Sequence, residues 1–149
     1  MTPVSQPYMN QQYGFVVPAI AGARAYRNQA PNPNHGVDLV LGDKRVITVS
    51  AEYDAAQLGS AKAYLELLLQ AAEVHGHPTM QVTRSAGRAA WSATVRQRDS
   101  VKKFVAVRRS DDGAINYALT LETTSAMAVE DAKTFDRLVR DLKFIAIER

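Results

Sequence analysis

Four runs of alternating apolar and polar side chains lie between Thr79 and Leu121, and no other feature of the sequence constrains the fold as much. The runs cover residues 79–85, 91–96, 101–108 and 114–121. A period of two is typical of half-buried β-strands, and strands joined by short turns pair antiparallel. We therefore expect the second half of the chain to form an antiparallel sheet, with Trp91 in its core.

Two segments have helical periodicity instead. Between Ser60 and His75, apolar residues recur three or four positions apart, with Ser60 as the expected N-cap and His75 near the stop. This helix is expected to be buried on more than half of its girth, although Leu67 and Leu69 could instead expose one edge to a partner. A second apolar stripe, from Ala132 to Leu142, predicts a closing helix.

The first half of the chain predicts strands. Residues 13–17 and 23–27 are rich in β-formers, and residues 37–41 and 45–51 form a hairpin pattern. Residues 1–12 are polar and irregular, which predicts a flexible N-terminal segment before a single domain at 13–149. Because strands and helices are segregated along the chain, the fold class is expected to be α+β.

Composition excludes several classes of protein. The 149 residues contain no cysteine, which excludes a disulfide framework, a thiolate zinc site and a cysteine nucleophile. No apolar run is long enough to predict a transmembrane segment. The start of the chain has no signal-peptide pattern, so we expect a cytoplasmic protein, or a periplasmic one if a leader was removed before residue 1.

The order of these elements resembles the PsbP/Mog1/DcrB-like superfamily. The resemblance rests on Tyr13–Pro18 followed by Arg24–Arg27 at the start, and on Asn116–Thr123 followed by Glu130–Phe144 at the end. It implies an antiparallel sheet flanked by helices in an α/β/α sandwich. It also implies a non-enzymatic binding or assembly role, because photosystem accessory subunits, a nuclear transport regulator and bacterial envelope lipoproteins are members.

Residues 35–38 and 49–55 are similar to small bacterial members that look like immunity proteins. The resemblance therefore implies, as the first functional hypothesis, an immunity protein that binds and neutralises a cognate toxin. The alternatives are an envelope or assembly accessory subunit, and a small hydrolase or ligand-binding enzyme whose site the sequence does not show.

Positive charge is concentrated in the predicted sheet. The chain has a net charge of +3, but residues 84–109 contain a single acid, Asp99, among eight basic residues. Such a surface could dock an acidic protein partner, or it could only guard a sheet edge against aggregation. No nucleic-acid partner is expected, because no recognition motif accompanies the charge. The basic candidates are Arg84, Arg88, Arg96, Arg98, Lys102, Lys103, Arg108 and Arg109.

A second group of candidate partner-binding residues lies around the predicted hairpin. The loop at 31–36 contains two prolines, which lower the entropy lost when a loop is fixed against a partner. His35, Tyr53 and Asp54 flank this hairpin and are expected to lie near the loop. The alternative is that the loop is only a stiff connection.

Catalytic, metal and cofactor sites are not expected. No nucleophile elbow, Ser-x-x-Lys pair or phosphate loop is present. His75 and His77, with Glu73 nearby, lack further ligands for a divalent ion. The acid pair Asp111–Asp112 is explained by a turn, and Glu130 and Asp131 by the favourable field at a helix start.

Overall fold

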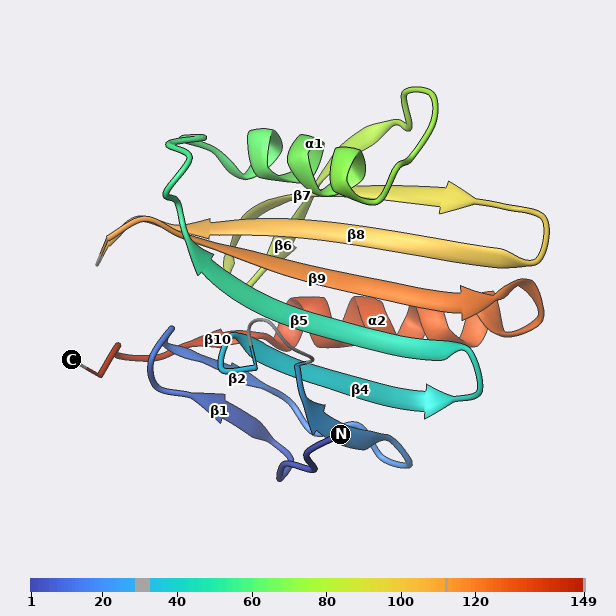
Figure 1. Cartoon of the computed structure of the whole chain (residues 1–149), viewed down its shortest axis with the longest axis horizontal. Helices are drawn as coiled ribbons and strands as arrows, with labels where there is room; N and C mark the ends of the chain where they lie inside the picture. Colours follow the sequence, from blue (N-terminus) through green and yellow to red (C-terminus); the bar gives the residue numbers. More distant parts are fainter. Residues whose placement is uncertain (29–32, 112, 149) are drawn as a thin grey trace.

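Seven antiparallel strands form one large sheet in a computed structural model, which describes residues 1–28, 33–111 and 113–148 (Figure 1). Across the sheet the order is β3-β4-β5-β9-β8-β7-β6, so the pair β5–β9 joins the two halves of the chain. The strands are β3 (Arg24–Arg27), β4 (Gly36–Gly42), β5 (Arg45–Tyr53), β6 (Met80–Ser85), β7 (Arg88–Arg96), β8 (Ser100–Arg109) and β9 (Ile115–Thr124).

Two helices cover opposite faces of this sheet. α1 (Ala61–Ala71) packs over β7, β8 and β9, whereas α2 (Ala128–Asp141), entered through the short helix η1 (Ser125–Met127), lies behind the sheet (Figure 1). Neighbouring residues of β9 separate the two cores: Ala118 packs with α1, and Leu119 packs with α2. Alternation along a strand sends successive side chains to opposite faces. The predicted α+β sandwich is confirmed.

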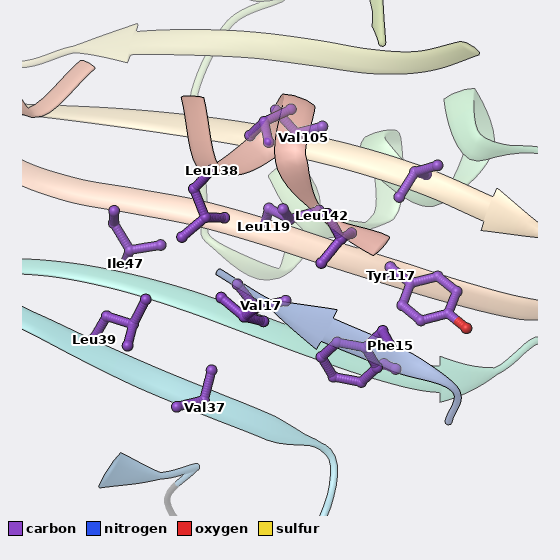
Figure 2. Close-up of a cluster of buried hydrophobic side chains, with 14 of the residues drawn as sticks. Phe15, Val17, Val37, Leu39, Ile47, Val105, Tyr117, Leu119, Leu138 and Leu142 are labelled. Atoms are coloured by element: carbon purple, nitrogen blue, oxygen red, sulfur yellow. The ribbon is translucent and has the colours of Figure 1, made fainter. Parts of the chain in front are cut away.

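A small second sheet shares the α2 side of the large one. It contains β1 (Tyr8–Asn10), β2 (Phe15–Val17) and β10 (Lys143–Phe144), in the order β1-β2-β10. Phe15 and Val17 belong to the same buried cluster as Leu138 and Leu142, which Figure 2 shows in front of the strands of the large sheet. This sheet therefore extends the layer that α2 begins.

The N-terminal residues are not the irregular segment that the sequence predicted. Residues 8–10 pair with β2, and the buried amide of Asn10 fixes the following turn: its Oδ1 accepts from the Tyr13 N–H at 2.9 Å. Its Nδ2 donates to the Asn34 carbonyl, also at 2.9 Å. A polar segment without clear periodicity is ordered here by hydrogen bonds to distant residues, which a local pattern does not reveal.

The first helix begins where the sequence predicted and ends earlier. Ser60 Oγ accepts from the Ala63 N–H at 3.1 Å, which confirms the N-cap. The helix stops at Ala71, and Glu73 then adopts a left-handed backbone with φ 55°. The expected burial of more than half of the helix girth is wrong. The buried residues of α1 are Tyr64, Leu65 and Leu69, and Leu67 is 39% exposed. One sheet face can bury only one side of a helix.

Candidate protein-docking surface

The two edges of the large sheet differ in whether another segment covers them. The outer edge of β3 is covered by the chain's own N-terminus: Arg27 N–H donates to the Thr2 carbonyl at 2.8 Å, and Val4 N–H donates to the Ala25 carbonyl at 3.0 Å. Pro3 also forms a bridge with Tyr26. Covering an edge in this way removes a template for pairing with another chain.

The other edge strand, β6, is open. It lies last in the sheet order, and within the part of the chain that the structure describes no segment pairs with its outer side. Its sequence, Met80–Ser85, contains no proline, and Arg84 is its single charged residue. Val82 is 63% exposed. A proline-free edge with a single charged residue and an exposed β-branched residue is suited to accept an additional strand.

An apolar groove lies beside this edge on the α1 side. It has a volume of about 590 Å³ and runs between α1 and residues 74–80. Leu67 of α1 lines it, together with Val74, Pro78 and Met80, the first residue of β6. Of the two residues that were expected to expose one edge of the helix, Leu67 is exposed, whereas Leu69 is buried at 8% exposure. The groove combines exposed apolar surface with a free strand.

A polar hollow lies on the opposite face, between α2 and strands β6–β8. It has a volume of about 340 Å³. The Lys103 Nζ pairs there with Asp136 Oδ1 at 2.9 Å, and Arg140 also lines the hollow. Two basic residues therefore face one acid. The remaining polar lining consists of Gln81, Thr83, Ser92 and Thr94.

Four of the eight basic candidates are held by acids of the same chain. Arg109 is 6% exposed; its Nη1 donates to the carbonyls of Gly14 at 2.9 Å and Ile145 at 2.7 Å. These bonds tie β8 to the small sheet. The ion pairs with acids are Arg88 with Asp111 at 3.4 Å, Arg109 with Asp111 at 3.2 Å, Arg108 with Asp54 at 2.6 Å and Lys103 with Asp136.

The structure does not bring the eight basic residues onto one surface. Neighbours along β8 alternate between faces, so Lys102 lies on the α1 side and Lys103 on the α2 side. Arg96, Arg98 and Lys102 lie near the turn from β7 to β8, with Arg96 on the α2 side and Lys102 on the α1 side, and we call these three residues the basic tip. Among the described acids, none lies within ion-pair distance of these three residues.

Asp54 is a structural anchor between β5 and α1. Its carboxylate is 3% exposed and accepts from Arg108 Nη1 at 2.6 Å. It also accepts from the backbone N–H groups of Leu58 at 2.9 Å and Gly59 at 3.0 Å. The Arg108 hydrogen bond, followed by those from Gly59 and Leu58, lowers the pKa of Asp54 to about 2. With its oxygens already occupied, this carboxylate is not presented to a partner.

The rings of His35 and Tyr53 both pack against the ring of Tyr13. The ring of Tyr13 lies 4.9 Å from that of His35 and 5.3 Å from that of Tyr53, and its hydroxyl lies 3.1 Å from His35 Nε2. Tyr53 is 52% exposed. Residues 31 and 32 of the nearby proline loop, and Asp112 of the predicted turn, lie outside the described residues. Strands β9, β8 and β7 separate this aromatic cluster from the β6 edge.

The sequence singled out only part of the docking surface, namely Leu67 in the groove and Lys103 in the hollow. Nothing in it marked Arg140, Val82 or the position of β6 at the open edge. The run that contains Val82 is bounded by Pro78 and Gly87, which indicates a short strand but not its position in the sheet. Among residues 1–28, 33–111 and 113–148, no group of three or more His, Asp or Glu could hold a metal ion.

Comparisons with known proteins give similarity in fold. No family model matches the chain, and no curated protein matches its sequence. Its structure is similar to cyanobacterial PsbP (CyanoP) from Synechocystis sp. PCC 6803, with TM-score 0.58 and 12% identity over 92% of this chain and 90% of that one. It is also similar to LpqN of Mycobacterium tuberculosis, with TM-score 0.55 and 13% identity over 97% of this chain and 90% of that one.

None of the helices, within the described residues, is long and apolar enough to cross a membrane. At sequence identities this low, the similarity applies to the fold alone and does not extend to activity. Both neighbours share the arrangement that the resemblance of the opening and closing segments implied. The chain has a PsbP/Mog1-like fold.

Proposed function

We propose that this chain is a non-enzymatic protein-binding subunit that acts as an accessory in an assembly, and that it docks through β6 and the apolar groove. The observation that carries the proposal is that one edge of the large sheet is covered and the other is open. The chain closes the β3 edge with its own residues 2–4 and leaves β6 free, beside exposed apolar side chains.

The fold neighbours support an accessory role more than a toxin-neutralising one. LpqN is described as involved in cell envelope biogenesis. The PsbP-like fold is thus found in a protein that contributes to building a larger structure. The immunity-protein hypothesis has no such support and stays a prediction from the resemblance.

Two exposed side chains supply the apolar contact. They are Leu67, which lines the groove together with Met80 of β6, and Val82, which lies two residues after Met80 on the same strand. Full burial of a Val or Leu side chain contributes about 1.5–3 kcal/mol. Hydrogen bonds to the free edge of β6 would add to this and fix the direction of the bound segment.

The basic tip has a different role in the proposal. Arg96, Arg98 and Lys102 form no ion pair with an acid among the described residues, so they can attract an acidic partner over a longer range. Reversing all three charges to Glu is expected to slow association and to leave folding intact. Binding at an unchanged rate would remove this steering role.

The test of the proposed function is assembly in the source cells. The tagged chain is expected to migrate with a larger complex in gel filtration, and Val82→Lys combined with Leu67→Glu is expected to release it. Val129→Lys is the matched control, because Val129 is 71% exposed on α2 and lines neither the groove nor the hollow. Retention of the double variant in the complex would contradict docking at this surface.

A further inference from the structure

The two faces of β6 offer an incoming strand different surroundings. By the strand register, the side chains of Met80, Val82 and Arg84 lie on the α1 side with the apolar groove, whereas Ser85 and the polar hollow lie on the α2 side. Side chains of an added strand alternate between these faces, about 4.8 Å from β6. Every second residue of that strand would therefore meet apolar surface, and the residues between would meet the hollow.

The charged residues that line the hollow determine which side chains of an added strand can bind there. Lys103 and Arg140 line it against Asp136 alone, and Lys103 is already paired with that acid at 2.9 Å. Arg140 is exposed in the last turn of α2 and forms no ion pair with a described acid. Hydroxyl groups of Thr83 and Thr94 supply further hydrogen-bond partners. This set favours carboxylate side chains.

We propose that β6 binds an extended segment of the partner protein in which apolar residues alternate with acidic residues. The inference rests on the proposed function and names the chemistry of the partner. Main-chain hydrogen bonds to β6 provide the common part of the affinity, and the alternating side chains provide selectivity. The apolar residues face Val82 and the groove, while the acidic residues face Arg140 and Lys103.

A second copy of the chain fits this surface less well. In an antiparallel pair of two β6 strands, the incoming strand would place Met80 and Val82 on the α1 side, which suits the groove. On the other side it would bring Gln81 and Thr83, which carry no negative charge. The hollow of each copy would then keep its unbalanced basic residues. Charge complementarity thus favours an acidic partner over self-pairing.

The experiment uses two synthetic peptides of about nine residues, the length of a long strand. Both have valine at every second position and threonine at the ends; one has glutamate between the valines, and the other has lysine. Each is titrated into the ¹⁵N-labelled full chain and followed by NMR. We expect the glutamate peptide to shift the amide signals of β6 and Arg140, and to bind about 10-fold tighter than the lysine peptide.

Paired variants and modified peptides make the result specific. Arg140→Glu is expected to reverse the preference between the peptides, whereas Arg137→Glu, on the exposed side of the same helix, is expected to leave it unchanged. Thermal unfolding shows whether both variants fold. Glutamate peptides N-methylated at the valines or at the glutamates test strand pairing, since alternate residues of a strand donate to the same neighbour. One of these two peptides must lose binding.

Several results overturn the inference. Equal affinity for the two peptides, shifts centred away from β6, or binding by both methylated peptides would each do so. Protection of β6 amides in a dimer of the free chain would assign the edge to a second copy instead. A chain that still assembles through Val82 and Leu67 in cells, but shows no preference for glutamate, would retain the proposed function and lose this account of its partner.

Discussion

At the scale of single residues, Asp54 and Arg108 show how a charged pair can be removed from the functional surface. Both were candidates for partner binding, and the structure joins them at 2.6 Å although they are 54 positions apart. The Asp54 carboxylate also holds the backbone at Leu58 and Gly59, which leads into α1. The pair therefore fixes the loop between β5 and α1.

Acid stability tests this assignment. The pKa of Asp54 is lowered from 3.8 to about 2 in the folded chain. A group with a depressed folded pKa adds stability above its unfolded pKa, and that stability is lost as the pH falls toward the folded pKa. Between pH 4 and pH 2 the chain is expected to lose stability faster than an Asp54→Asn variant, which lacks the carboxylate.

Urea unfolding at a series of pH values measures the difference between the two chains. Asp136→Asn is the control, because this acid pairs with Lys103 on the surface and its side chain is 56% exposed. A wild-type profile parallel to that of Asp54→Asn below pH 4 would show that Asp54 does not stabilise the fold through its charge.

At the scale of elements, a second ion pair connects the β4–β5 hairpin to the start of α2. Arg45 donates through Nε and Nη2 to both oxygens of Asp131, each at 2.8 Å, and Thr123 Oγ1 donates to the same carboxylate at 2.6 Å. Asp131 is 3% exposed. The sequence explained Asp131 only by its place in the first helical turn, so this tertiary role is new.

Removal of that carboxylate should loosen the contact between hairpin and helix. Asp131→Ala leaves the Arg45 guanidinium and the Thr123 hydroxyl without their shared partner, and is expected to lower the free energy of unfolding by about 2–4 kcal/mol. Glu130→Ala, one residue earlier on the exposed side, is expected to cost less than about 1 kcal/mol. Chemical denaturation followed by circular dichroism compares them, and equal losses would contradict the buried role of Asp131.

At the scale of the whole molecule, the sheet has one edge closed by the N-terminus and one left open. Residues 2–4 pair along β3 even though the sequence predicted a flexible segment there. The same residues contribute no strand to the large sheet, so their contribution is protection of an edge. A chain with two open edges could join copies at both ends and grow without closing.

Deletion of residues 1–4 tests this protective role. The shortened chain is expected to keep its seven-stranded sheet and to self-associate at concentrations at which the full chain does not, because the β3 edge becomes free. Sedimentation velocity over a range of concentrations measures the effect. Adding Arg27→Pro removes the outward N–H that pairs with Thr2 in the full chain, at an exposed position of β3, and is expected to suppress the self-association. Association that persists unchanged in this variant would place the contact elsewhere.

The predicted elements and the predicted site fared differently, for one physical reason. The strands at 79–121, the cap at Ser60 and the α+β class follow from local periodicity, and the structure confirms them. The basic surface depended on which acids fold next to which cations. Arg109 reaches the Gly14 carbonyl, 95 positions away, and so becomes a buried connector instead of a docking residue.

By itself, the sequence determined the strands of the large sheet and the two α-helices, because their periodicity depends on neighbours within a few residues. The tertiary structure alone decided that β5 pairs with β9, that β3 is covered, and that β6 remains free between an apolar groove and a basic hollow. These outcomes depend on contacts between residues far apart in the chain, whose geometry exists only once the whole sheet has formed.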